Sequence, residues 1–172
     1  MEKRSNAVTF KGSPLTLVGP QLKPGTKAPD FTCLNGLEKV SLGNTPAKAR
    51  LFSAVPSLDT PVCSLETKKF DEAIGTLKDK VACYTISLDL PFAQKRFCTA
   101  EKVNNMQTLS DVHNRSFGEH YGVLIEGLPL ALLSRAVFVV DKTGTITYVE
   151  YVPEVASEPK YDAALAALKA AV

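Results

Sequence analysis

The sequence predicts an α/β protein in which a mixed central β-sheet is flanked by helices and preceded by an N-terminal β-hairpin. Short apolar runs rich in β-branched and aromatic residues alternate with longer amphipathic stretches, a pattern typical of β-α-β units. The runs 135–140 and 145–150 are joined by the turn sequence DKTG, which predicts an antiparallel hairpin late in the chain. With 172 residues, 45% of them hydrophobic, the chain fits a single domain, 1–172, that can bury a sizeable core.

The N-terminal part of the chain is predicted to form a hairpin followed by a short strand. Residues 8–10 and 15–17 alternate as strands do, and the turn sequence KGSP joins them, so we expect a hairpin over about 8–18. After an irregular connection, a short strand is expected near 31–34. It carries Cys33, which we interpret as a packing residue because buried cysteines usually behave as small hydrophobic side chains.

The middle of the chain passes from a buried strand into a helix. Residues 50–55 form a short apolar run typical of a strand covered on both faces. Pro56 ends that strand, and Thr60 followed by Pro61 predicts a helix N-terminus. The helix is expected over 62–77, and its amphipathic character predicts that it packs on the sheet. Its expected apolar face consists of Val62, Leu65, Phe70, Ala73, Ile74 and Leu77.

The remaining elements complete a sheet of mixed direction. In chain order they are predicted as a strand at 81–88, helices at 92–97 and 115–121 separated by a strand at 105–109, the hairpin strands at 135–140 and 145–150, and a helix at 161–171. Ser157 is the expected N-cap of the last helix. The β-α-β part predicts parallel strands and the hairpin predicts antiparallel ones, an order that matches the thioredoxin-like fold.

Composition and charge argue against several classes of partner. The formal charge of +2, without a block of Lys and Arg, does not indicate a nucleic-acid-binding protein. No apolar run approaches the ~20 residues of a membrane helix, so no membrane association is expected. The basic pair Lys3-Arg4 is followed by polar residues rather than by the apolar segment of a signal peptide. We therefore expect a cytoplasmic protein.

The cysteine pattern indicates chemistry rather than a disulfide scaffold or a metal site. The chain has four cysteines and no C-x-x-C motif, which excludes a dithiol within one turn and the usual zinc pattern. Only His113 and His120 could add ligands, and no metal or other cofactor is expected. In a reducing compartment, an oxidised pair of cysteines would be part of a reaction. Cys83 lies within a predicted buried strand and is interpreted as a core residue.

Cys63 lies in the first turn of the predicted helix, at the carboxyl end of a strand, where open α/β sheets hold their sites. Unpaired N–H groups and the positive end of the helix dipole favour an anion there, so this position favours a reactive thiolate. A small buried hydrophobic residue is the alternative. Position alone does not decide between the two.

Several separated segments identify a family. VPSLDTPVC, which ends at Cys63, resembles the active-site motif of peroxiredoxins, and most closely that of their thiol peroxidase subgroup. DLPFAQKRFC, which ends at Cys98, resembles the segment with the second cysteine of this subgroup. LLSRAVFVVD is similar to its strand with the active-site arginine, EPKYDAALAALK to its terminal helix, and VTFKGSPLTLVG to its N-terminal hairpin. The resemblance runs from about residue 8 to the end.

The resemblance implies a thioredoxin-dependent peroxidase of the atypical two-cysteine type. Cys63 would be the peroxidatic nucleophile that becomes a sulfenic acid, and Cys98 the resolving cysteine that condenses with it into an intramolecular disulfide. Thr60 would face the sulfur and the peroxide, Arg135 would stabilise the thiolate and orient the peroxide, and Pro56 would cover the pocket. Hydrogen peroxide and organic hydroperoxides are the implied substrates, thioredoxin the reductant and a homodimer the assembly, without metal, haem or flavin.

The same residues allow plainer roles. Thr60 has the spacing of an ordinary helix cap, and Pro56 can simply end a strand. Arg135 opens an apolar strand, where a guanidinium needs an anionic partner unless it lies solvated at the strand end. His113 and His120 match no role in the family and are expected to be solvated.

Cys63 and Cys98 are too far apart in sequence for one helix, so a disulfide between them requires adjacent elements. If the reduced protein holds them farther apart than a disulfide allows, the first turn after Thr60 and the end of the 92–97 helix must unwind. Two other interpretations stay open. One is a peroxide-sensing redox protein on the same fold without sustained turnover, and the other has all four cysteines as core residues.

Overall fold

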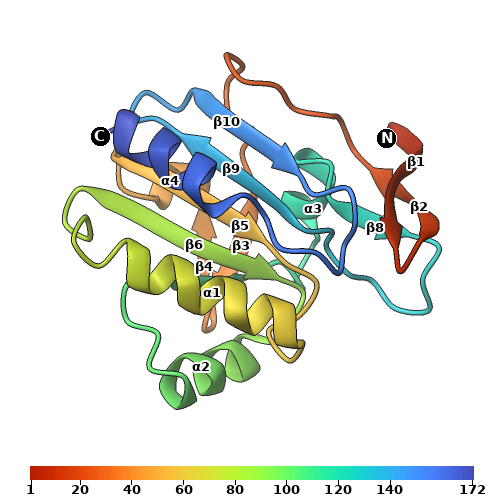
Figure 1. Cartoon of the computed structure of the whole chain (residues 1–172), viewed down its shortest axis with the longest axis horizontal. Helices are drawn as coiled ribbons and strands as arrows, with labels where there is room; N and C mark the ends of the chain where they lie inside the picture. The colour runs from red at the N-terminus through yellow and green to blue at the C-terminus, as the bar shows by residue number, and fades with distance from the viewer.

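The computed structural model describes residues 1–172 and contains a seven-stranded mixed sheet, a separate three-stranded sheet and four α-helices (Figure 1). The large sheet comprises β3 (Thr32–Asn35), β4 (Glu38–Ser41), β5 (Ala49–Ala54), β6 (Val81–Ser87), β7 (Gln107–Ser110), β9 (Ala136–Val140) and β10 (Ile146–Tyr151). Its strand order is β10-β9-β5-β6-β7-β3-β4. β5, β6 and β7 are parallel, whereas the remaining pairs are antiparallel. The predicted mixed sheet is confirmed.

Helices cover both faces of this sheet. They are α1 (Pro61–Ala73), α2 (Pro91–Ala100), α3 (Ser116–His120) and α4 (Tyr161–Ala170). α1, α2 and α4 contribute Phe70, Phe97 and Leu168 to a buried cluster that also holds Leu51 and Val137 of the central strands. α3 packs on the opposite face, and Figure 1 shows α1 and α4 in front of the sheet with α3 behind it. All residues of β5, β6 and β9 are therefore buried.

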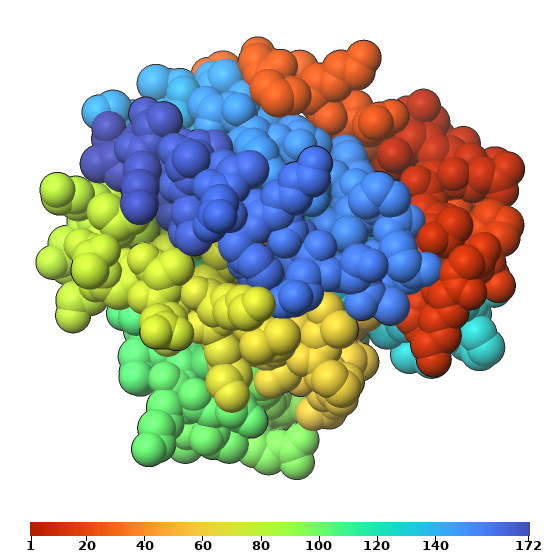
Figure 2. Space-filling view, viewed as in Figure 1, coloured from red at the N-terminus to blue at the C-terminus, as the bar shows by residue number.

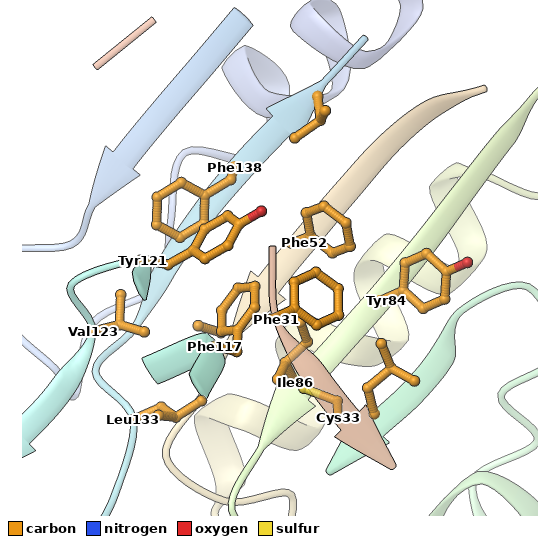
Figure 3. Packing of buried hydrophobic residues seen from close by; sticks show 14 of the residues in the cluster. Phe31, Cys33, Phe52, Tyr84, Ile86, Phe117, Tyr121, Val123, Leu133 and Phe138 are labelled. Atoms are coloured by element: carbon orange, nitrogen blue, oxygen red, sulfur yellow. The ribbon is translucent and has the colours of Figure 1, made fainter. Parts of the chain in front are cut away.

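The core on the α3 face is aromatic (Figure 3). The rings of Phe117 and Tyr121 are stacked with their centroids 4.2 Å apart, and Tyr121 meets Phe138 of β9 edge to face at 5.1 Å. Phe31 packs against Phe52 of β5 and against Phe117. Because such pairs combine large apolar area with defined geometry, they hold α3 and the segment before β3 on the sheet.

The N-terminal hairpin belongs to the small sheet, which lies at one end of the molecule (Figure 2). It consists of β1 (Lys3–Phe10), β2 (Ser13–Val18) and β8 (Leu124–Glu126). The amide of Thr9 donates to the carbonyl of Pro153, and the amide of Val155 donates to the carbonyl of Thr9, both at 2.8 Å. These bonds dock the hairpin against the segment that follows β10.

α1 departs from the predicted helix over 62–77. It ends at Ala73, and turns follow, because Gly75 has a high conformational cost inside a helix. The predicted apolar face is only partly confirmed, since Phe70 and Ile74 are buried but Leu65 is 43% exposed. The helix instead buries mostly cysteine and polar side chains near the sheet, which find partners there: Cys63, Glu66, Thr67, Phe70 and Asp71.

Other differences also have local causes. The strand predicted at 105–109 starts at Gln107, because the amides of 104–106 donate to the Asp71 carboxylate instead of to a neighbouring strand. The prediction of Ser157 as N-cap is wrong. α4 begins after Lys160, since Pro159 disfavours a helical conformation in the residue before it.

The remaining corrections concern short elements and ends. The hairpin starts at Lys3 rather than near residue 8, and the short strands β4 and β8 were not predicted. α2 continues to Ala100 rather than ending near residue 97, and it carries Cys98 near its end, as expected. No helix in the structure is long and apolar enough to cross a membrane.

Candidate active site

Cys63 lies in the first turn of α1, immediately beyond the carboxyl end of β5. Thr60 is the N-cap residue with extended backbone angles, and Pro61 begins the helix, as the sequence predicts. Pro61 is tolerated there because the first helical N–H has no partner within the helix. The Cys63 side chain is 0% exposed, so its chemistry depends on the few groups that touch it.

Arg135 is the charged group in contact with the sulfur. It directly precedes β9, its side chain is only 2% exposed, and its Nη2 donates to the Cys63 Sγ at 3.3 Å. Its Nη1 donates to Glu66 Oε2 at 2.5 Å, and its Nε donates to the carbonyl of Val155 at 2.9 Å. The alternative of a solvated arginine at the strand end is therefore wrong. The guanidinium has the anionic partner that burial requires.

Glu66 is a site residue that sequence reasoning missed. It lies one turn after Cys63 on the same face of α1 and is 0% exposed. Ser53 of β5 donates to its Oε1 at 3.0 Å, while Arg135 binds the other oxygen. Burial raises the pKa of Glu66 to about 7, and the Arg135 charge opposes this rise. An acidic residue three positions after a cysteine in a helix was the available signal.

The guanidinium responds to both neighbours. Burial alone lowers the pKa of Arg135, but the charges of Glu66 and Cys63 and the hydrogen bonds to them together raise it. Arg135 is therefore held as a cation between a carboxylate and a sulfur. The sulfur therefore has a cationic donor in direct contact with it.

Thr60 and Pro56 lie beside this group with different exposure. Pro56 is buried, whereas Thr60 is exposed. The Thr60 hydroxyl donates to the carbonyl of Ser57 at 2.8 Å and makes no side-chain capping bond, so the expected cap of the α1 amides is absent. Both residues nevertheless line the same cavity as Arg135.

That cavity has a volume of about 300 Å³ and a largely apolar lining. The N-terminal hairpin supplies one wall, with Phe10 and Leu15, while Ile125, Leu132 and Val155 supply another. A small molecule in the cavity would meet hydrocarbon on most sides and polar groups near Arg135 and Thr60. The arrangement can hold an apolar group while one oxygen approaches a cationic donor.

Cys98 is half-buried in α2, where its sulfur lies 3.9 Å from the Thr108 hydroxyl of β7. Burial raises the pKa of the Cys98 thiol, and the Thr108 hydrogen bond opposes this rise. Cys98 packs against the same buried cluster that contains Cys63. All four cysteines are free thiols, so Cys63 and Cys98 are not bonded to each other in this structure.

The other sequence candidates lie elsewhere. Cys33 and Cys83 are buried within strands, as predicted, and Cys33 donates to Asp111. His113 and His120 are exposed, as expected, although the His120 Nδ1 also lies 2.6 Å from the carbonyl of Asp30. No group of three or more His, Cys, Asp and Glu side chains is arranged to hold a metal ion.

Comparison with known proteins shows the family of this chain. The model of the Redoxin family matches residues 23–165. The chain is 50% identical to a thiol peroxidase of Halalkalibacterium halodurans over 167 residues, covering 96% of this chain and 99% of that protein. It is 52% identical to a thiol peroxidase of Listeria monocytogenes over 165 residues, covering 95% and 98% of the two chains.

Solved structures agree as well. A peroxiredoxin-like protein from Aquifex aeolicus superposes with a TM-score of 0.90 at 43% identity, covering 97% of this chain and 98% of that one. A thiol peroxidase from Chromobacterium violaceum has a TM-score of 0.85 at 21% identity and covers 95% of both chains, which shows the shared thioredoxin-like fold. The chain therefore belongs to the Redoxin family and, within it, to the thiol peroxidase group of the peroxiredoxins.

Proposed function

We propose that this protein is a thiol-dependent peroxidase that reduces hydroperoxides at Cys63. The observation that carries the proposal is the buried contact between the Cys63 sulfur and the Arg135 guanidinium, 3.3 Å apart, at the edge of an apolar cavity. Similarity to thiol peroxidases at about half-identical sequence supports the same activity. A thiolate, a cationic donor and a substrate cavity are the parts that such a reaction needs.

In the first step, the Cys63 thiolate attacks one oxygen of the peroxide and the O–O bond breaks. The sulfur gains that oxygen and becomes a sulfenic acid, while the other oxygen leaves with the bonding electrons and a proton as water or an alcohol. Arg135 stabilises the thiolate and donates to the peroxide oxygens as negative charge moves onto the leaving oxygen. Glu66 fixes the orientation of the guanidinium, because it accepts a hydrogen bond from Nη1 while Nη2 is directed at the sulfur.

Thr60 and Pro56 complete the first step in this proposal. The Thr60 hydroxyl lines the cavity and donates to the Ser57 carbonyl, so its lone pairs can accept a hydrogen bond from the peroxide O–H. Pro56 is buried beside the cavity and excludes water from the reacting sulfur.

The lining of the cavity supports organic hydroperoxides as substrates in addition to hydrogen peroxide. Phe10, Leu132 and Val155 offer apolar contacts to an alkyl chain. Hydrogen peroxide has no group that benefits from these contacts, so it requires only the polar end with Arg135 and Thr60.

In the second step, the Cys98 thiol attacks the sulfenic acid. An S–S bond forms, the S–O bond breaks and water leaves, which gives the Cys63–Cys98 disulfide. Each thiol contacts another group, Arg135 or Thr108, and each lies inside a helix. A disulfide needs Cα atoms roughly 4.4–6.8 Å apart. We expect the first turn of α1 and the end of α2 to unwind before the bond forms.

An external dithiol must reduce this disulfide, and thioredoxin is the reductant that we propose. A homodimer and a cytoplasmic location also belong to the proposal, since they follow from the resemblance to the thiol peroxidase group. No metal, haem or flavin takes part, because the cysteines and the two substrates account for all electrons transferred.

A coupled assay with thioredoxin, thioredoxin reductase and NADPH tests the proposal. We expect continuous NADPH oxidation with hydrogen peroxide and with an alkyl hydroperoxide, and none with the Cys63→Ser variant. Mass spectrometry after one equivalent of peroxide should find residues 63 and 98 cross-linked within one chain. A wild-type protein that forms this disulfide but does not turn over would instead be a peroxide sensor.

A further inference from the structure

Asp89 connects the segment before α1 to the end of β6. Its Oδ1 accepts a hydrogen bond from the Ser57 hydroxyl at 2.7 Å. Its Oδ2 accepts from the amide of Leu58 at 2.8 Å and from the hydroxyl of Ser87 at 2.7 Å. Ser57 and Leu58 belong to the turn that leads to Cys63. One carboxylate therefore holds this turn against the sheet through two hydrogen bonds.

Asp89 also lies at the start of α2, the helix that carries Cys98, and is linked to it through Ser87. Asp89 directly precedes the N-cap residue of α2, and its own carbonyl accepts from the Ser110 hydroxyl at 2.5 Å. Gln94, in the first half of α2, donates to the Ser87 hydroxyl at 3.1 Å and to the carbonyl of Leu109 at 2.9 Å. Gln94 is 1% exposed, so these bonds are shielded from water.

The segments that lead into the two cysteine-bearing helices thus share one partly buried polar network, here called the Asp89 network and defined as Ser57, Ser87, Asp89, Gln94 and Ser110. The proposed disulfide requires the turn before Cys63, the helix of Cys98 or both to move. Movement of the turn breaks the bonds from Ser57 and Leu58 to the carboxylate. Such bonds to an ionised acceptor are among the stronger hydrogen bonds in proteins, so they oppose the movement.

We propose that Asp89 is a positioning residue that holds the active-site turn closed and thereby limits how fast the Cys63 sulfenic acid reaches Cys98. This inference rests on the proposed function. In the closed arrangement Cys63 contacts Arg135, which lines the cavity, and in this arrangement the sulfur reacts with peroxide. In the open arrangement it can meet Cys98. Asp89 stabilises the first arrangement at the expense of the second.

The sulfenic acid has two fates, and their ratio measures this balance. Attack by the Cys98 thiol gives the disulfide and water. Attack on a second hydroperoxide transfers another oxygen to sulfur, which gives a sulfinic acid and another molecule of water or alcohol. The second fate needs Cys63 in the closed arrangement. Weakening the Asp89 network should therefore favour the disulfide over the sulfinic acid.

The test uses Asp89→Asn in the full-length protein. The amide keeps the size of the side chain but places an NH₂ group where one of the two oxygens accepted hydrogen bonds. We expect disulfide formation about tenfold faster, the factor that corresponds to one weakened charge-assisted hydrogen bond, and about tenfold more peroxide needed for half over-oxidation. Quenched mixing followed by mass spectrometry measures both quantities. Ser57→Ala removes one donor and should shift both in the same direction by a smaller factor.

Asp111→Asn is the matched control. Asp111 is 0% exposed, and its carboxylate accepts hydrogen bonds from the amides of Phe117 and Gly118 at the start of α3. This carboxylate makes no hydrogen bond to the turn before Cys63 or to α2. The variant should change the stability of the protein without changing the ratio of disulfide to sulfinic acid.

The outcomes separate this inference from the proposed function. Suppose that wild type forms the Cys63–Cys98 disulfide, but that the ratio of disulfide to sulfinic acid in Asp89→Asn and Ser57→Ala stays within a factor of two of the wild-type ratio. The proposed role of Asp89 is then wrong. If Asp111→Asn shifts the ratio as much as Asp89→Asn does, general loosening explains the effect and the inference also fails. If wild type forms no such disulfide at all, the proposed function is what fails.

Discussion

Cys63 and Cys33 are both 0% exposed, yet they face neighbours of opposite charge. Cys63 belongs to the buried cluster under α1 and α4, and its sulfur accepts a hydrogen bond from Arg135 at 3.3 Å. Cys33 belongs to the aromatic cluster on the other face of the sheet, and its thiol donates to the Asp111 carboxylate at 3.5 Å. Burial is the same in both, so the sign of the neighbouring charge is what distinguishes them.

The surroundings of Cys33 keep its proton in place. Burial raises the pKa of the Cys33 thiol, and the charge of Asp111 and the hydrogen bond to it raise it further. Asp111 also accepts the amides of Phe117 and Gly118 at the start of α3, at 3.0 and 2.7 Å. This carboxylate thus organises a helix and disfavours a thiolate at the same time. At Cys63, the neighbouring group is instead a cation that donates a hydrogen bond to the sulfur.

The comparison is tested most directly by replacing each cysteine with serine. Cys63→Ser should lose peroxidase turnover by on the order of 10³-fold or more, because a serine hydroxyl has no reactive anion at neutral pH. Cys33→Ser should stay close to wild type, since its thiol is held protonated. The coupled NADPH assay measures both variants. Equal losses in the two would contradict the distinction between the thiols.

Removing the Arg135 cation should make Cys63 less reactive and therefore more similar to Cys33. Arg135→Ala should slow the reaction with peroxide by roughly 10- to 100-fold, the factor for one charge-assisted hydrogen bond, and reduce alkylation of Cys63 by iodoacetamide. Alkylation of Cys33 should not change.

Folding must be controlled in this experiment, because Arg135→Ala leaves Glu66 as an unpaired buried carboxylate. The double variant Arg135→Gln with Glu66→Gln removes both charges and keeps groups of similar size that can bond to each other. Its free energy of unfolding should be close to that of wild type, but it should react with peroxide as slowly as Arg135→Ala. A fast double variant would show that the cation is not what activates Cys63.

The carboxylate beside Cys33 should be visible in the pH dependence of stability. Burial raises the pKa of Asp111 to about 6, from a usual 3.8. The unfolded chain therefore loses this proton at lower pH than the folded protein. The free energy of unfolding should fall by up to about 3 kcal/mol as pH rises from about 4 to about 6 because of this group.

Asp111→Asn removes that titration without adding a new one. Urea unfolding of the reduced proteins across this pH range should show that the stability of wild type relative to the variant declines as pH rises. Groups such as Glu66 titrate in both proteins and cancel from the difference. Two parallel curves would mean that Asp111 is not a buried carboxylate in solution.

The smallest effect on the reaction with peroxide is expected when the neutral hydroxyl of Thr60 is removed. Thr60→Val should slow the reaction with peroxide about fivefold, the value of one neutral hydrogen bond. Thr60→Ser, which keeps the hydroxyl, should react nearly as fast as wild type. Neither variant should change the reactivity of Cys63 toward iodoacetamide, because the Thr60 hydroxyl donates to the Ser57 carbonyl rather than to the sulfur. A loss of rate as large as that of Arg135→Ala would mean that the Arg135 charge contributes no more to the reaction with peroxide than a neutral hydroxyl does.

Local sequence predicted where α1 begins more accurately than where it ends or which face it buries. Thr60 and Pro61 define the N-terminus through their own backbone preferences, and these do not depend on distant residues. The buried face depends on partners. Asp71 is buried because the amides of 104–106 come to it, and an amphipathic pattern read from one segment does not contain that information.

The sequence by itself determined the strand–helix passage that puts Cys63 at a sheet edge, the family motifs and the alternation of strands and helices. These follow from conformational preferences of neighbouring residues. Only the tertiary structure decided that Arg135 meets Glu66 and Cys63, and that Asp111 meets Cys33. Those pairings arise because the sheet brings distant segments to the same face, where burial makes the sign of each charge decisive.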